Sequence, residues 1–108
     1  MQDGTYLVKS DGSIVNYGDR WAYGYFVGNG WSGINRDPST ITDWAGLLQL
    51  VTLKSGSKLV GVWTDTRTGR VYIDPVTHVS DRESAIELGL ARAEMAIWDA
   101  RDNVEIIL

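Results

Sequence analysis

The clearest helical pattern of apolar residues lies in the C-terminal third of the chain. Ser80 can cap this helix, and Glu83 completes a capping box, because each side chain can bond a backbone N–H that the first turn leaves free. Apolar residues then recur at helical spacing. The stripe that we expect to be buried consists of Ala85, Ile86, Leu90 and Ala93, with Leu88 and Met95 at its margins. We therefore predict a helix over about 81–93 that lies on a sheet.

A second helical pattern covers about 42–51. Its apolar side chains recur at i, i+3, i+4 and i+7, at Trp44, Leu47, Leu48 and Val51. Thr40 or Thr42 can cap it, whereas Gly46 weakens the helix by about 1 kcal/mol relative to alanine. A strand over 49–53 is the alternative interpretation.

Short apolar runs bounded by turn residues predict the strands. They lie at about 5–9, 14–17, 21–27, 59–63, 70–73, 95–98 and 104–108. Gly28-Asn-Gly30 is typical of a hairpin turn. Asp74-Pro75 is expected to end a strand, because proline has no N–H to donate to a ladder. The sequence therefore predicts an α+β domain, an antiparallel sheet of about six or seven strands with two helices at about 42–51 and 81–93.

An internal similarity suggests one refinement of this fold. Residues 37–43 resemble residues 74–81 with one residue inserted, and each segment precedes a helical pattern. One interpretation is a domain of two β-β-α halves. The other is that Asp-Pro followed by Thr or Ser is simply common where a strand leads into a helix. A repeat requires the same strand order in both halves.

Length, composition and charge exclude several classes of protein. A chain of 108 residues forms one domain, 1–108. The absence of cysteine excludes disulfides, thiolate metal sites and cysteine nucleophiles. A net charge of −4 argues against non-specific nucleic-acid binding, which needs clustered basic residues. We see no apolar run long enough to span a membrane, no signal peptide and no cofactor motif, so we expect a cytoplasmic protein.

His78 is the only histidine, and it lies near Asp74 and Asp81 in the sequence. A histidine beside carboxylates can act as a general base or a metal ligand. No second histidine and no cysteine exist to complete a zinc site, and no zinc-protease spacing occurs. We therefore expect His78 to be a loop residue, and a small hydrolase using His78 with a nearby Asp is an alternative function.

The aromatic segment 17–31 is the strongest indication of function. Tyrosine and tryptophan are enriched at binding hot spots, because they bury a large area at little cost in rotamer entropy. Strand alternation places several of these rings on one face. The binding surface that we predict consists of Arg20, Trp21, Tyr23, Tyr25 and Trp31. The alternative is that the rings fill the core.

Residues 79–89, 94–99 and 104–107 resemble the C-terminal half of small uncharacterised proteins of actinobacteria and their phages. The resemblance covers about the last third of the chain. It implies an accessory or phage-borne protein and carries no activity with it.

The function that we expect is that of a non-enzymatic cytoplasmic factor which binds a protein partner through its aromatic surface. The same surface could join two copies into a homodimer. An alternative is a small-ligand binder or sponge, with a nucleotide or sugar stacked on the rings. That alternative predicts a concave aromatic pocket with Arg20 or Arg36 at its rim.

Overall fold

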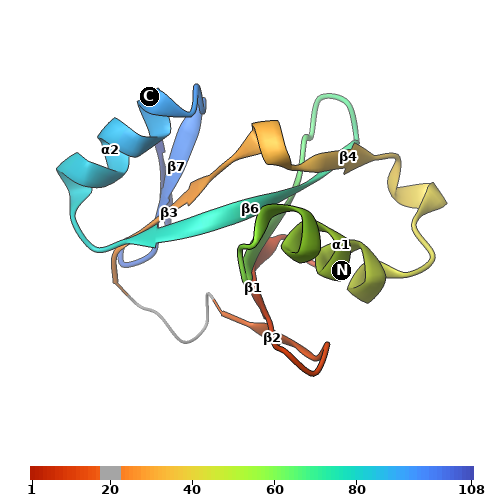
Figure 1. The fold of residues 1–108 in the computed structure, drawn as a ribbon. Helices are drawn as coiled ribbons and strands as arrows, with labels where there is room; N and C mark the ends of the chain where they lie inside the picture. Colours follow the sequence, from red (N-terminus) through yellow and green to blue (C-terminus); the bar gives the residue numbers. More distant parts are fainter. Residues whose placement is uncertain (18–22) are drawn as a thin grey trace.

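The computed structural model describes residues 1–17 and 23–108, and it confirms the predicted α+β class (Figure 1). The described strands are β1 (Gly4–Val8), β2 (Ile14–Asn16), β3 (Tyr25–Gly28), β4 (Ile34–Arg36), β5 (Leu59–Thr64), β6 (Val71–Val79), β7 (Ala96–Asp99) and β8 (Val104–Ile107). The helices are α1 (Trp44–Ser55) and α2 (Arg82–Ala91), with 3₁₀ turns η1 (Gly30–Ser32) and η2 (Pro38–Thr40) on either side of β4. β4 is the strand that the sequence pattern missed.

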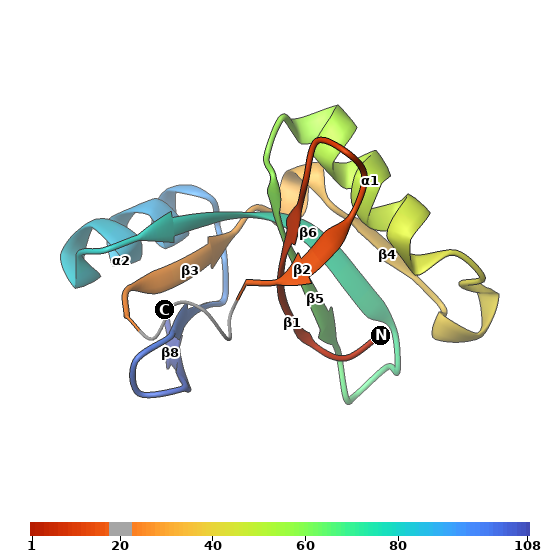
Figure 2. The same ribbon diagram turned by 90° about the horizontal axis from the view of Figure 1, so that it is seen from below.

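The long strand β6 organises the antiparallel sheet, whose order is β2-β1-β5-β6-β3-β7-β8. One edge of β6 pairs with β5. Its other edge pairs with β4 near its start and with β3 near its end. β6 therefore joins two halves, which lie toward its two ends in Figure 2. We call β1, β2, β4, β5 and α1 the first half, and β3, β7, β8 and α2 the second half.

β6 continues through Asp74 and Pro75, so the prediction that this pair ends a strand is wrong. In a strand, the N and the C=O of one residue point to the same edge. The Pro75 carbonyl accepts a hydrogen bond from the Asn29 N–H at 2.9 Å. The Pro75 nitrogen, which carries no hydrogen, therefore points into the gap between β4 and β3, where the chain leaves the sheet through η1. Proline removes no ladder bond at this point.

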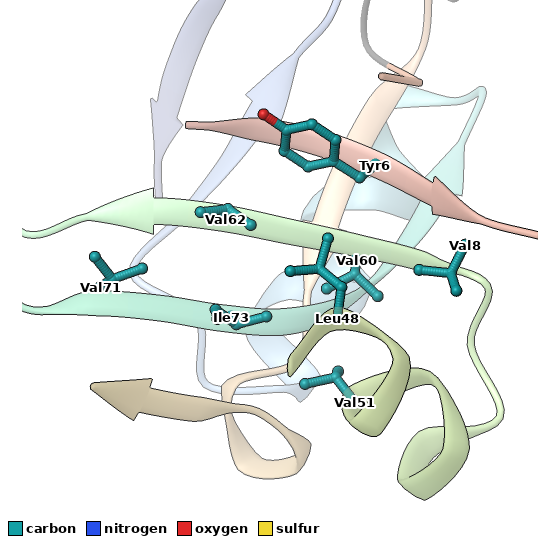
Figure 3. Close-up of a cluster of buried hydrophobic side chains, with 8 residues drawn as sticks. All are labelled: Tyr6, Val8, Leu48, Val51, Val60, Val62, Val71 and Ile73. Carbon is teal, nitrogen blue, oxygen red and sulfur yellow. The ribbon is translucent and has the colours of Figure 1, made fainter. Parts of the chain in front are cut away.

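The first half holds the larger core, which lies between the sheet and α1 (Figure 3). Its buried side chains are Tyr6, Val8, Leu48, Val51, Val60, Val62, Val71 and Ile73. The predicted stripe of α1 is confirmed, because Leu48 and Val51 are buried and Trp44 and Leu47 pack against the cluster.

The helix α1 differs from the prediction at both ends. Asp43, not a threonine, caps α1 by accepting a hydrogen bond from the Gly46 N–H at 2.9 Å. A Cβ at Gly46 would collide with this carboxylate, so the glycine that weakens the helix also makes room for its cap. The helix runs on to Ser55 and ends at Gly56, whose φ of +76° is the left-handed conformation that suits glycine.

The second half holds a smaller core of Val27, Ala85 and Ile97 beneath α2. Asp81, not Ser80, caps α2 by accepting a hydrogen bond from the Ser84 N–H at 2.8 Å. The predicted stripe is correct at Ala85 and wrong at Leu90 and Ala93, which are exposed.

The buried face of α2 includes a glycine, a residue that an apolar pattern does not identify. Gly89 lies one turn after Ala85 and is buried, with Ile86 and Leu88 partly buried beside it. A Cβ at Gly89 would lie 2.9 Å from Ile97 Cγ2, so the helix approaches the sheet most closely at the residue without a side chain.

The interpretation as two β-β-α repeats is wrong. β5 and β6 pair with each other as a hairpin, whereas β3 and β4 both pair with β6 and lie end to end along it. Gly28-Asn-Gly30 accordingly forms no hairpin turn, and the chain enters η1 instead. The strand order differs between the two proposed repeats, which is the outcome that excludes them.

Candidate functional site

Trp31 lies in η1, the turn between β3 and β4, and 83% of its surface is exposed. Its indole N–H donates a hydrogen bond to the Arg92 carbonyl at 3.1 Å, at the end of α2. No other aromatic ring of the described residues contacts it. The ring is therefore open to solvent while its orientation is fixed at one edge.

The backbone of η1 is held by a charge-assisted hydrogen bond. The Gly30 N–H donates to Glu94 Oε1 at 2.9 Å. Hydrogen bonds to a carboxylate are about twice as strong as those between neutral groups. A Cβ at Gly28 would lie 3.2 Å from the same oxygen, so this glycine leaves room for the carboxylate. Gly30 and the Trp31 indole thus fasten η1 to the segment that follows α2.

Two further apolar side chains, Leu90 and Met95, are each more than half exposed. Leu90 and Met95 flank Arg92 in the sequence, on either side of the carbonyl that holds Trp31. Ile107 is also exposed, but its neighbour Ile106 packs against the core beneath α2, so strand alternation points Ile107 to the other face of the sheet. We call Trp31, Leu90 and Met95 the Trp31 surface.

The other residues of the predicted binding surface do not join Trp31. Tyr23 is half exposed and lies beside the His78 ring, near the start of β3, whereas η1 follows the end of β3. Tyr25 is partly buried and packs against the core beneath α2. Arg20 and Trp21 lie outside the described residues. Strand alternation therefore does not produce one exposed row of rings from Tyr23 to Trp31.

A second group of rings lies on the face of the sheet that points away from the helices. Val71, Ile73 and Val79 of β6 face the two cores, so the alternate residues Tyr72 and His78 face the other way. Tyr72 and His78 each contact other rings. The closest pairs of ring centroids are Trp63 and Tyr72 at 4.6 Å, Phe26 and His78 at 5.2 Å, and Tyr23 and His78 at 5.4 Å.

Mutual packing makes this second group less open than Trp31. Phe26 is buried, and Trp63 lies stacked on Tyr72. The sequence pattern missed Trp63 as a surface residue, because its strand holds one aromatic residue and resembles a core strand. The predicted hairpin pairing of its strand with 70–73 was the available signal, since it puts Trp63 across from Tyr72.

Asp74 is buried in the middle of β6, so the prediction that it lies at a strand end is wrong. Burial raises the pKa of its carboxyl to about 6, and the negative charge of Glu94 adds to this, while a hydrogen bond from Trp63 opposes it. A Cβ at Gly33 would collide with Asp74 Oδ1, so the Gly33 backbone closes over the carboxyl. Neither main pocket of the described structure is lined by Asp74, so we assign it no catalytic role.

His78 does not lie beside Asp74, one of the two aspartates with which the hydrolase hypothesis could pair it. It lies in β6 rather than in a loop, with Nε2 3.0 Å from the Tyr23 carbonyl oxygen. Asp74 is four residues away along the strand, a distance of about 13 Å. Asp81 caps α2, and its hydrogen bonds from Ser84 hold its pKa below the ordinary value.

Two shallow pockets lie at opposite ends of α2. One, of about 270 Å³, is bounded by η1, the end of α1 and Arg92. The other, of about 330 Å³, is lined by Tyr23, Tyr25, Arg82 and Arg101 together with acidic residues. Arg36, expected at the rim of a ligand pocket, lies on β4 and donates to the Asn35 carbonyl.

Comparison with known proteins finds no matching family model, no matching curated protein and no matching solved structure. Within residues 1–17 and 23–108, no helix has both the length and the apolar character to cross a membrane. The same residues contain no group of three or more histidine, cysteine or acidic side chains placed to hold a metal ion.

Proposed function

We propose that this protein acts by binding another protein through the Trp31 surface, as a non-enzymatic accessory factor of the cytoplasm. The observation that carries the proposal is Trp31 itself, a tryptophan that is 83% exposed and yet oriented by a hydrogen bond. Tryptophan in a folded domain usually buries most of its area. Because Trp31 is not part of either core, its ring is available to a partner.

The neighbours of Trp31 support a protein as the partner. Single exposed apolar residues are ordinary, but a group of them around one point is typical of an interaction site. Leu90 and Met95, which are close in sequence to the Arg92 carbonyl that holds Trp31, are also more than half exposed. Tryptophan is enriched among the residues that contribute most to binding at protein interfaces. The net charge of −4 argues against non-specific nucleic-acid binding.

The fixed orientation of the ring also favours binding. Association must restrict every side chain that enters the interface, at about 0.5–1.5 kcal/mol for a flexible one. The bond from the indole N–H to the Arg92 carbonyl and the bond from the Gly30 N–H to Glu94 already restrict η1 in the free protein. Less entropy is then lost when a partner covers Trp31.

The first prediction concerns the proteins that wild type and Trp31→Ala capture from a lysate. With a tagged protein in a bacterial lysate, we expect one partner to bind wild type and to fall at least tenfold with Trp31→Ala, because removing a hot-spot residue costs about 2 kcal/mol or more. Quantitative mass spectrometry measures the ratio.

Tyr23→Ala is the matched control, since it removes an aromatic ring of half exposure from the opposite end of β3. We expect it to retain the partner, and circular dichroism establishes that both variants are folded. Equal capture by wild type and a folded Trp31→Ala would end the proposal.

A further inference from the structure

We propose that the pocket between η1, the end of α1 and Arg92 binds a phosphate group. This site lies beside the Trp31 surface and goes beyond the proposed function, since its ligand is an oxyanion rather than an apolar partner surface. It is tested on the isolated protein, so its outcome does not depend on whether Trp31 binds a partner.

The positive charge of Arg92 has no counter-ion in the described structure. The side chain is partly buried, and its guanidinium donates to the Val27 carbonyl at 3.1 Å and to Thr77 Oγ1 at 2.9 Å. A weaker contact at 3.4 Å reaches the Gly28 carbonyl. The ion pairs between described residues involve Arg67 and Arg101 but not Arg92. An unpaired, partly buried cation on a pocket wall attracts an anion.

The guanidinium is held in place and still has N–H groups to offer. Arginine carries five N–H donors in a rigid fork. The contacts to Val27, Gly28 and Thr77 use the two terminal nitrogens, and none uses Nε. The fork is therefore fixed by the protein before any ligand arrives. This is the arrangement in which an arginine binds phosphate with good geometry.

Other donors line the same pocket. The side chains of Asn29 and Ser32 line it and make no hydrogen bond with any residue of the described parts of the chain. The Thr77 hydroxyl accepts from Arg92, which leaves its own hydrogen available. These donors come from η1 and its cap on one side and from β6 on the other. A ligand with several acceptor oxygens would satisfy both sides at once.

The size and chemistry of the pocket fit a phosphate group. Its volume of about 270 Å³ exceeds the roughly 30 Å³ of one water molecule several-fold, which leaves room for a tetrahedral group and its hydration. No acidic residue lines the pocket, whereas Asp99 and Asp102 line the pocket at the other end of α2. The donor set therefore favours an anion here and not there.

The test is an NMR titration of the ¹⁵N-labelled full chain with inorganic phosphate, with sodium chloride added to hold ionic strength constant. We expect saturable shifts of the Asn29, Ser32 and Thr77 amides. Arg92→Gln should weaken phosphate binding about tenfold or more, because a hydrogen bond to a charged group is lost. Arg82→Gln, on the other pocket, should leave the affinity unchanged.

Ser32→Ala covers the case in which Arg92→Gln disturbs the fold, because the Ser32 side chain is exposed and makes no bond within the described structure. We expect about a threefold loss of phosphate affinity. Shifts that match those from sodium chloride alone would overturn the proposal, as would equal losses in Arg92→Gln and Arg82→Gln.

A second arm identifies the source of the phosphate. A phosphoserine peptide and its unphosphorylated form are titrated into the same sample. Tighter binding of the phosphoserine peptide than of inorganic phosphate assigns the pocket to a phosphorylated segment of a partner. Equal or weaker binding of that peptide assigns it to a free phosphate. Binding of both peptides with equal affinity contradicts a phosphate site.

Discussion

The Asp74 carboxyl is the residue whose environment has the clearest measurable consequence. It is buried beneath Gly33 and Trp63 and lies near Glu94, so its pKa in the folded protein is raised to about 6. The ordinary value is 3.8. Between these values the folded state binds more protons than the unfolded chain. The free energy of unfolding therefore falls as the pH rises from about 4 to about 6.5.

Asp74→Asn should remove this loss of stability. One pKa unit corresponds to about 1.4 kcal/mol, so ionising Asp74 costs the folded state up to about 3 kcal/mol at neutral pH. We expect Asp74→Asn to be more stable than wild type at pH 7 and to differ little from it at pH 4. Urea unfolding at both values measures the difference. If the variant were less stable than wild type at pH 7, the ionised Asp74 carboxylate would stabilise the folded state, which contradicts the prediction.

At the residue scale, each of the two interpretations of the aromatic segment is correct at a different residue, since Trp31 is exposed and Tyr25 packs against the core beneath α2. Trp31 follows a glycine turn and precedes Gly33, so no strand could draw it into the sheet. Strand alternation groups Tyr25 with Trp21 and Tyr23 in the predicted binding surface. Alternation assigns a side chain to a face, but it does not say which face a helix will cover, and α2 packs over Tyr25.

At the scale of elements, α2 shows how a glycine decides which face of a helix is buried. The apolar pattern favoured Leu90, but Gly89 lets the helix backbone approach Ile97 and Leu108. Because α2 lies close to the sheet at Gly89, the buried face of the helix differs from the face that the apolar pattern predicts. A periodicity argument counts only apolar residues, so it could not detect this contact.

Gly89→Ala should destabilise the protein. Alanine in a helix interior is ordinarily better than glycine by about 1 kcal/mol. Here the added methyl group would lie 2.9 Å from Ile97 Cγ2, and overpacking of this kind costs about 1–3 kcal/mol. We expect a lower melting temperature than wild type. A higher melting temperature would mean that α2 does not lie this close to the sheet.

Leu90→Asp gives the opposite expectation for the adjacent residue. Leu90 is more than half exposed, so the new charge stays in water and the stability should change by less than about 1 kcal/mol. The same substitution places a charge in the Trp31 surface and should weaken partner binding. Thermal unfolding and capture of the partner separate these effects. If Leu90→Asp unfolded the protein, Leu90 would be buried, as the apolar pattern predicts.

The strands that the sequence located best are those that pair with a neighbour in the chain. The hairpins β1–β2 and β5–β6 follow from apolar runs around a glycine turn, and Gly12 and Gly69 have the positive φ values expected there. β4 and the second part of β6 depend on pairing between distant segments. Local patterns carry little information about such pairing, and β6 passes through Pro75 only because β3 and β4 leave a gap there.

At the scale of the whole molecule, β6 connects two cores of unequal size. The core cluster beneath α1 comprises eight buried side chains, two of them from β6, whereas the cluster beneath α2 comprises three. Apolar burial is the main stabilising contribution in a small domain. The strand β8 also lies at the edge of the sheet, with one neighbour. The second half should therefore be the less stable part of the fold.

Native-state hydrogen exchange should show this difference. We expect the amides of β7 and β8 to exchange through local opening, at a lower free energy than the amides shared by β5 and β6. Leu48→Ala, which opens a cavity in the larger core, should lower the protection of β5 and β6 by about 2–5 kcal/mol. Equal protection of both halves in wild type would indicate one cooperative unit.

The central claim is that Trp31 contacts a protein partner, and site-specific photo-cross-linking tests it most directly. A photoreactive phenylalanine analogue replaces Trp31 in one sample and Tyr23 in another, and each is irradiated in a bacterial lysate. We predict an adduct with one protein from position 31 and none with that protein from position 23. Adducts of equal yield from both positions, or an adduct from position 31 with only a second copy of the chain, would contradict the account.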